Sequence, residues 1–194
     1  MQPSPAEIKQ VFNTVSLPAT AVEHIGSKFA KIELVKDDVL ITANDIVTTQ
    51  YYVLTGCLRT FYLAPNGKEH TLQFAINDWW ISDYTAYFEG SRAIMTIEVI
   101  EACTLLKITK ANLDRLYEEF PVLEAFFRKK LEKAFASFQK RILANLALPA
   151  KERYLQFMHT YPNIEQHVKN YHIASYLGIT TESLSRIRKE LANT

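Results

Sequence analysis

The sequence predicts an α+β protein in which an antiparallel β-sandwich or barrel precedes a set of helices, and three observations support this. Apolar and polar residues alternate over much of residues 30–108, which is the period of half-buried strands. Residues 121–148 contain no glycine and no proline after Pro121, so they predict one helix about 40 Å long. Residues 171–191 have the spacing of two short helices joined by one tight turn.

The β-region contains one clear hairpin signal, Pro65-Asn66-Gly67, between the strand-like runs 57–63 and 68–76. Asn-Gly supplies the positive φ angles that a tight hairpin turn requires. The other elements expected along the chain are helices over residues 5–13, 18–28, 111–120 and 149–162 and a short edge strand over residues 164–168.

Composition places the chain among globular proteins. It has 194 residues, of which 48% are hydrophobic, enough for a buried core and for two domains. We expect a cytoplasmic protein with no membrane partner, because the sequence contains neither an apolar run of 18 residues nor a signal peptide. Cys57 and Cys103 are isolated within strand-like segments, so they predict buried thiols and not a metal site or redox pair.

Charge is distributed unevenly along the chain. Residues 1–127 hold 10 Lys and Arg against 16 Asp and Glu, giving −6, while residues 128–194 hold 12 against 5, giving +7; together these make the net charge of +1. The basic part contains the two C-terminal helices. Attraction to phosphates depends on where charge lies and not on its sum, so this asymmetry favours a nucleic-acid partner.

The two C-terminal helices predict a helix-turn-helix that binds DNA. Ala174 allows the helices to cross closely, Gly178 suits the positive φ of the turn, and Thr180 is placed to cap the second helix. The water-facing side chains of the second helix suit base edges and phosphates in a major groove; they are Thr181, Glu182, Ser183, Ser185, Arg186, Arg188 and Lys189. The alternative is an ordinary helical hairpin with a solvated face.

The long helix predicts a homodimer. Its apolar residues recur at steps of three or four and define the expected dimer seam: Leu123, Phe127, Leu131, Ala134, Phe138 and Ile142, with Phe126 and Phe135 widening the stripe. The alternative is that the helix lies wholly against the β-sandwich. Its length favours the dimer, because it exceeds what a domain of about 120 residues covers.

The order of elements resembles the Crp/Fnr family of transcription regulators. Residues 77–82 look like the family's G-D-F-x-G-E, and Arg92-Ala93-Ile94 looks like its R-[SA]-A phosphate-binding end. The resemblance implies a β-roll of the double-stranded jelly-roll type over residues 1–120, a dimerisation helix over 121–148 and a helix-turn-helix domain over 149–194. It also implies that Glu182 and Arg186 read bases, with two recognition helices of a dimer entering successive major grooves of a palindromic site.

The same resemblance implies an effector site with an altered preference. Ile81-Ser82 stand where cyclic-nucleotide binders of the family have Gly-Glu, so the carboxylate for the ribose is missing and cyclic AMP is not expected. A small anionic effector at Arg92 is the candidate ligand, and a surface arginine is an equal interpretation. The expected effector-binding residues are Ile81, Ser82, Asp83, Tyr84, Arg92 and Ala93. Trp79 is expected in the core, whereas Trp80 and Tyr84 could belong either to the core or to a pocket.

No enzyme, catalytic residue, metal site or firm cofactor is predicted. The sequence has no Gly-rich phosphate loop, no nucleophile elbow and no close grouping of histidine and cysteine. The expected function is therefore transcription regulation, with double-stranded DNA and a second copy as partners and RNA polymerase as a further candidate. The alternative is a small-molecule-sensing β-roll whose helical tail binds a protein instead of DNA.

Overall fold

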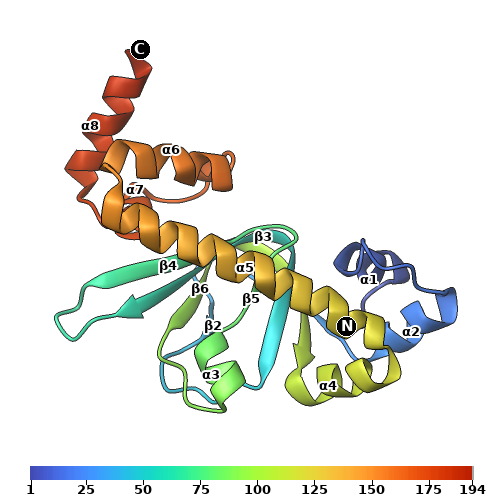
Figure 1. The fold of residues 1–194 in the computed structure, drawn as a ribbon. Coiled ribbons are helices and arrows are strands. Elements are labelled where there is room, and N and C mark those ends of the chain that lie inside the picture. Colours follow the sequence, from blue (N-terminus) through green and yellow to red (C-terminus); the bar gives the residue numbers. More distant parts are fainter. Residues whose placement is uncertain (194) are drawn as a thin grey trace. The chain divides into compact units, whose positions relative to one another are not determined.

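The computed structural model describes residues 1–193 and shows an antiparallel sheet followed by helices (Figure 1). The strands are β1 (Ala30–Leu34), β2 (Val39–Ile41), β3 (Thr49–Leu63), β4 (Glu69–Ala75), β5 (Trp80–Ile81) and β6 (Thr96–Thr109). The α-helices are α1 (Pro5–Val11), α2 (Ala19–Ser27), α3 (Tyr84–Glu89), α4 (Lys110–Glu119), α5 (Pro121–Ala147), α6 (Ala150–Thr160), α7 (Asn170–Leu177) and α8 (Thr181–Ala192). The predicted α+β class is confirmed.

The six strands form one sheet in the order β1-β6-β3-β4, with β2 pairing with β6 and β5 with β3. Strand β1 pairs antiparallel with β6 from Ala30 opposite Lys107 to Leu34 opposite Cys103. Strands β3 and β6 approach closely at Gly56, where an added Cβ would lie 2.5 Å from the carbonyl oxygen of Ala102. A glycine with φ of +95° is therefore required there.

Three local predictions were wrong. Only Gly67 of the Asn66-Gly67 pair has a positive φ, so the hairpin turn lacks the two positive φ angles that the sequence predicts. Residues 164–166 form a 3₁₀ helix instead of an edge strand, because their hydrogen bonds are local: the amides of Gln166 and His167 donate to the carbonyls of Asn163 and Ile164. Helix α3 lies within residues 30–108, for which the sequence predicts an antiparallel sandwich or barrel and no helix. Its sequence signals are Asp83 as N-cap and Gly90 as left-handed C-cap.

Two apolar clusters form the core around the sheet. One lies inside the sheet and includes Val53, Leu58, Ile97 and Leu105, all completely buried. Its neighbours Cys57 and Cys103 are buried free thiols, as predicted. Burial raises the pKa of the Cys57 thiol to about 12 and that of Cys103 to about 11, so both stay protonated at neutral pH.

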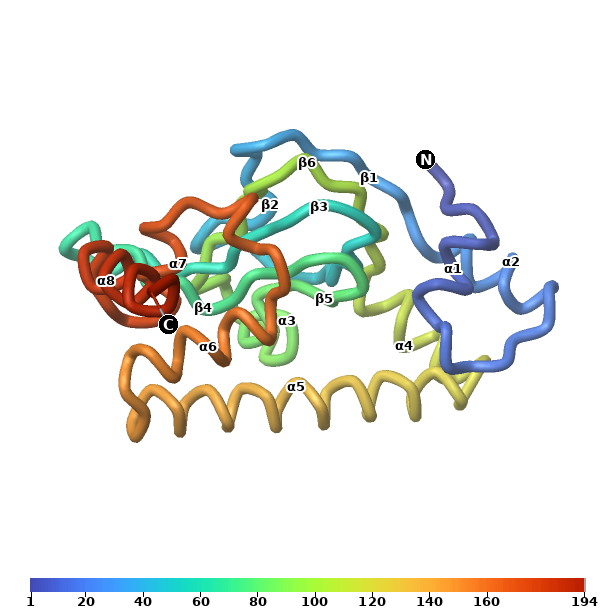
Figure 2. Tube along the Cα trace, turned by 90° about the horizontal axis from the view of Figure 1, so that it is seen from above, coloured from blue at the N-terminus to red at the C-terminus, as the bar shows by residue number. Residues whose placement is uncertain are grey.

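The second cluster joins the short helices to the start of α5. Figures 1 and 2 show α1, α2 and α4 gathered around that end of the long helix. Leu123 and Phe127 of α5 are 0% and 7% exposed and pack in this cluster. The prediction that these two residues belong to an intermolecular seam is therefore wrong, because side chains of the same chain already cover them.

Packing divides the chain into two compact units. One contains residues 1–60 and 74–131, and the other contains residues 61–73 and 132–194. The second unit thus combines the tip of the β3–β4 hairpin with the C-terminal helices. The three predicted segments, 1–120, 121–148 and 149–194, stay a prediction about domains. No helix within residues 1–193 is both long and apolar enough to cross a membrane.

Candidate nucleic-acid interface and effector cassette

Helices α7 and α8 form the predicted helix-turn-helix. Gly178 ends α7 in the left-handed conformation, with φ of +66°. Thr180 then caps α8, its hydroxyl accepting a hydrogen bond from the amide of Ser183 at 3.2 Å. Ala174 of α7 and Leu184 and Ile187 of α8 are buried. The apolar face of α8 therefore packs within the domain, and its opposite face is left for a partner.

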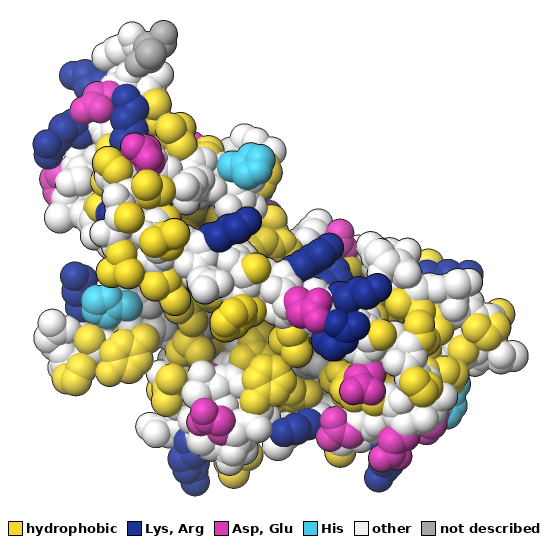
Figure 3. Space-filling model, in the orientation of Figure 1, with side chains coloured by type: hydrophobic (Ala, Val, Ile, Leu, Met, Phe, Trp, Pro, Cys, Tyr) yellow, Lys and Arg dark blue, Asp and Glu magenta, His cyan; other side chains and the backbone are white. Residues whose placement is uncertain are grey.

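The opposite face of α8 is exposed and carries most of the predicted DNA-binding residues: Thr181, Glu182, Ser185, Arg186 and Lys189. Lys and Arg side chains lie over α8 at the upper left of Figure 3. Glu182 is held locally. Hydrogen bonds from its own backbone amide, and then from the Thr180 and Thr181 hydroxyls, lower the pKa of its carboxyl. Glu182 is thus an ionised acceptor, which suits the amino group of a cytosine.

Arg188 differs from the other predicted DNA-binding residues because it binds inside the domain. Its guanidinium lies 2.5 Å from the carboxylate of Glu165 and donates to Asn170 Oδ1 at 2.6 Å and to the Tyr154 hydroxyl at 3.2 Å. Tyr154 also donates to Glu165. This network holds α8 against α6 and the 3₁₀ helix. Each nitrogen of the guanidinium thus has a contact within the domain, and a role of Arg188 toward DNA stays a prediction.

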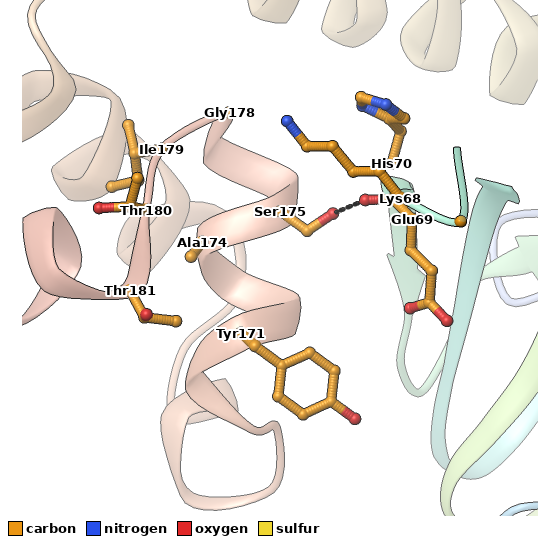
Figure 4. A pocket seen from close by; sticks show the side chains of 11 residues that line it. Lys68, Glu69, His70, Tyr171, Ala174, Ser175, Gly178, Ile179, Thr180 and Thr181 are labelled. Atoms are coloured by element: carbon orange, nitrogen blue, oxygen red, sulfur yellow. Dashed lines mark hydrogen bonds between the residues drawn. The ribbon is translucent and has the colours of Figure 1, made fainter. Parts of the chain in front are cut away.

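The hairpin tip docks on α7 through Ser175 (Figure 4). The Ser175 hydroxyl donates to the carbonyl oxygen of Glu69 at 2.7 Å and accepts from the amide of Thr71 at 2.9 Å. One side chain thus provides both hydrogen bonds that a neighbouring strand would give to β4. Arg141 of α5 donates to the carbonyl of Leu72 and stacks on Tyr176, with its guanidinium 4.8 Å from the ring centroid.

A hollow of about 510 Å³ lies between the hairpin tip and the turn of the helix-turn-helix. Lys68 and His70 line it on one side, and Thr180 and Thr181 on the other (Figure 4). The sequence gives no sign that Lys68 and His70 lie near the start of α8. More than 100 residues separate the two segments, and no local pattern reports such a contact.

Ser175→Ala should release the hairpin tip. The amide of Thr71 then loses its acceptor and becomes available to solvent, so its hydrogen exchange should accelerate by roughly 10-fold or more. Amide exchange measured by NMR tests this prediction. The matched control is Ser185→Ala, because Ser185 is an exposed serine of the same domain. Equal exchange rates in wild type and Ser175→Ala would contradict the proposed role of the hydroxyl.

Beyond its buried start, α5 exposes a stripe of large apolar side chains at steps of three or four residues. Leu131 is 45% exposed, Phe135 71%, Ile142 57% and Leu146 81%, while Phe138 is partly buried. Ala134 is exposed at the edge of the stripe. Four of the six predicted seam residues, Leu131, Ala134, Phe138 and Ile142, therefore stay available to a second copy. Phe135 and Leu146 extend the same face.

The predicted effector-binding residues form a compact group, which we call the cassette and define as residues 81–84 and 92–95. Ile81, Ser82, Asp83 and Ala93 are all at least 96% buried. The Ser82 hydroxyl donates to the carbonyl oxygen of Thr49 at 2.9 Å. Most of the predicted effector residues therefore already have partners within the chain.

Arg92 of the cassette is exposed and is bound to the neighbouring loop. Its guanidinium donates to the carbonyl oxygen of Asn44 at 2.7 Å, and Arg92 forms a β-bridge with Ile46. This arrangement agrees with the interpretation of Arg92 as a surface arginine. Its role toward an anion stays a prediction.

The aromatic residues around the cassette pack as core. Trp79 packs against the cluster inside the sheet, as expected. Trp80 packs in the other cluster, with ring centroids 4.9 Å from Phe127 and 5.3 Å from Tyr52. Tyr84 stacks on Phe88 at 5.4 Å, and burial raises the pKa of its hydroxyl. The structure thus places Trp80, left open above, in the core.

The β-region is similar in sequence to a known domain family. Residues 31–120 match the model of the cyclic nucleotide-binding domain. The chain is 24% identical over 175 residues to the nitrogen fixation regulation protein FixK of Bradyrhizobium diazoefficiens, an alignment that covers 84% of this chain and 71% of that protein. The chain therefore combines a domain of the cyclic nucleotide-binding type with a helix-turn-helix.

Solved structures extend the similarity over almost the whole chain. The c-di-GMP responsive global regulator CLP of Xanthomonas campestris has a TM-score of 0.72 and 15% identity, with 91% of this chain and 92% of that chain covered. A CooA mutant of Carboxydothermus hydrogenoformans has a TM-score of 0.71 and 19% identity, with 96% and 84% covered. These similarities show that the chain has the fold of these proteins, with an antiparallel β-domain, a long helix and C-terminal helices.

Proposed function

We propose that this chain binds a palindromic double-stranded DNA site as a homodimer and regulates transcription from it in the cytoplasm. The observation that carries the proposal is the division of α8 into two faces. Leu184 and Ile187 are buried within the domain, whereas Thr181, Glu182, Ser185, Arg186 and Lys189 face solvent. These five side chains provide the donors, acceptors and positive charge that a major groove recognises.

The dimer is supported by the exposed apolar stripe of α5. Phe135, Ile142 and Leu146 lie on one face of a single continuous helix. A second copy, packed along the same face, buries these side chains and presents two recognition helices to one duplex. RNA polymerase stays a candidate partner, for which we propose no contact surface.

Selection of bound duplexes from a random pool tests the function directly. We expect a palindrome whose half-sites are about one helical turn apart, because dimer symmetry is copied in the site. Anisotropy titration of that duplex across salt concentrations should show affinity falling steeply as salt rises. No enriched sequence together with no salt dependence would favour the alternative, in which the helical tail binds a protein.

Arg186→Ala should weaken binding to the selected site by about 1–3 kcal/mol and relax base preference at one position in each half-site, because Arg186 is exposed and suits the N7 and O6 of guanine. Binding of single-base variants of the site gives the measurement. Lys189→Ala is the matched control, and it should weaken all sequences alike. Unchanged base selectivity in Arg186→Ala would refute the assigned role.

The small anionic effector predicted from the sequence is left out of this proposal. Such an anion would have to reach Arg92, which is bound to Asn44, and the buried residues of the cassette, which have partners of their own. The altered Ile81-Ser82 pair also lacks the carboxylate expected for a cyclic nucleotide.

A further inference from the structure

We propose that Asp83 is the internal ligand of the cassette: its carboxylate takes the place of an external anion, so the β-roll functions without a small anionic effector. The part of this inference that concerns regulation rests on the proposed DNA-binding function. The part that concerns ligand binding rests on the cassette alone.

The carboxylate of Asp83 is completely buried and accepts three backbone hydrogen bonds. Its Oδ2 accepts from the amides of Ile94 at 2.8 Å and Met95 at 3.0 Å, and its Oδ1 accepts from the amide of Ala86 at 3.2 Å. Converging backbone amides are the usual way in which a protein binds an oxyanion. Here the oxyanion belongs to the chain itself.

Further donors of the cassette also have acceptors within the chain. The amide of Ala93 donates to the carbonyl oxygen of Asp45 at 2.9 Å, so the amides of three successive residues, 93, 94 and 95, all have internal acceptors. The Arg92 guanidinium donates to Asn44, and the Ser82 hydroxyl to Thr49. An anion that binds at the amides of residues 93–95 would therefore have to displace existing contacts.

A tethered carboxylate is difficult to displace. Asp83 is held at its position by the backbone, so its effective concentration at the three amides greatly exceeds that of a free metabolite. Asp83 also caps α3, so displacement of its carboxylate would remove the N-cap and destabilise the helix that begins at Tyr84. The same carboxylate thus fills the cassette and fixes its fold.

Chemical rescue tests whether Asp83 acts as an internal anion. In the full chain, Asp83→Ala should melt at a lower temperature than wild type, and sodium formate at tens of millimolar should restore about 3 °C or more relative to equal sodium chloride. Wild type should show no such gain. Asp45→Ala is the matched control, because Asp45 is exposed and its carboxylate accepts a local turn amide, that of Thr42 at 2.8 Å.

The formate experiment has outcomes that either support or overturn the proposal. A formate effect confined to Asp83→Ala supports the proposal, whereas no rescue, or equal stabilisation of wild type, overturns it. If Asp83→Ala does not fold, Asp83→Asn keeps the volume and one acceptor; it should fold, melt below wild type and bind no cyclic nucleotide.

Direct titration decides the effector question in wild type. Calorimetry with cyclic AMP and cyclic GMP should give no binding heat, and neither nucleotide should change affinity for the selected duplex by more than about 2-fold. Stoichiometric binding of either nucleotide would overturn the proposal. The calorimetric measurements test ligand binding to the cassette without DNA. A failure to bind DNA would therefore contradict the proposed function without contradicting this inference. DNA binding that requires a cyclic nucleotide would support the proposed function and contradict this inference.

Discussion

Ile142→Asp is expected to separate the proposed dimer and to lower affinity for a palindromic duplex by roughly 100-fold or more. Ile142 is 57% exposed and lies between Phe135 and Leu146 on the apolar stripe of α5. A carboxylate at this position would be buried without a partner in the dimer, whereas water solvates it in the single chain. A single chain binds only one half-site, so the gain in affinity that comes from binding two linked half-sites is lost.

Sedimentation velocity and anisotropy titration measure the two effects. Ser137→Asp is the matched control, because it adds the same charge to an exposed position on the opposite face of α5. We expect that variant to stay dimeric and to bind DNA within about 2-fold of wild type. A dimeric Ile142→Asp, or a monomer that still binds the palindrome at full affinity, would contradict the proposed seam.

Phe127→Ala should destabilise the folded chain by about 3–5 kcal/mol, the usual range for removing a buried phenylalanine. Phe127 is 7% exposed, and its ring centroid lies 4.9 Å from that of Trp80, 5.4 Å from Phe126 and 5.7 Å from Tyr117. Removal of the ring leaves a cavity among these aromatic side chains. Denaturant unfolding followed by tryptophan fluorescence gives the free energy of unfolding.

The comparison with Phe135→Ala makes this result specific. Phe135 is 71% exposed, so its truncation should change the stability of the single chain by less than about 1 kcal/mol and act mainly on the dimer. If Phe127→Ala instead weakened dimerisation and left the unfolding of the single chain unchanged, Phe127 would belong to the seam that the sequence predicted.

The sequence determined those features that depend on neighbouring residues. Gly178 and Thr180 defined the turn of the helix-turn-helix because a left-handed cap and a hydroxyl cap act within a few residues. The absence of glycine, and of any proline after Pro121, defined α5 for the same reason. The motif between residues 77 and 94 located the cassette, although it did not show which of its residues were already bound.

Only the tertiary structure decided which neighbour covers each helix face and which polar groups are already paired. Helical periodicity placed Phe127 and Ile142 on similar stripes, but α1 and α2 cover the start of α5 and leave Ile142 exposed. Arg188 and Arg186 are equivalent in the local sequence pattern, but in the structure Glu165 and Asn170 lie at the Arg188 guanidinium. The physical reason is that burial and hydrogen bonding depend on contacts between residues far apart in the chain, and a local pattern carries no record of them.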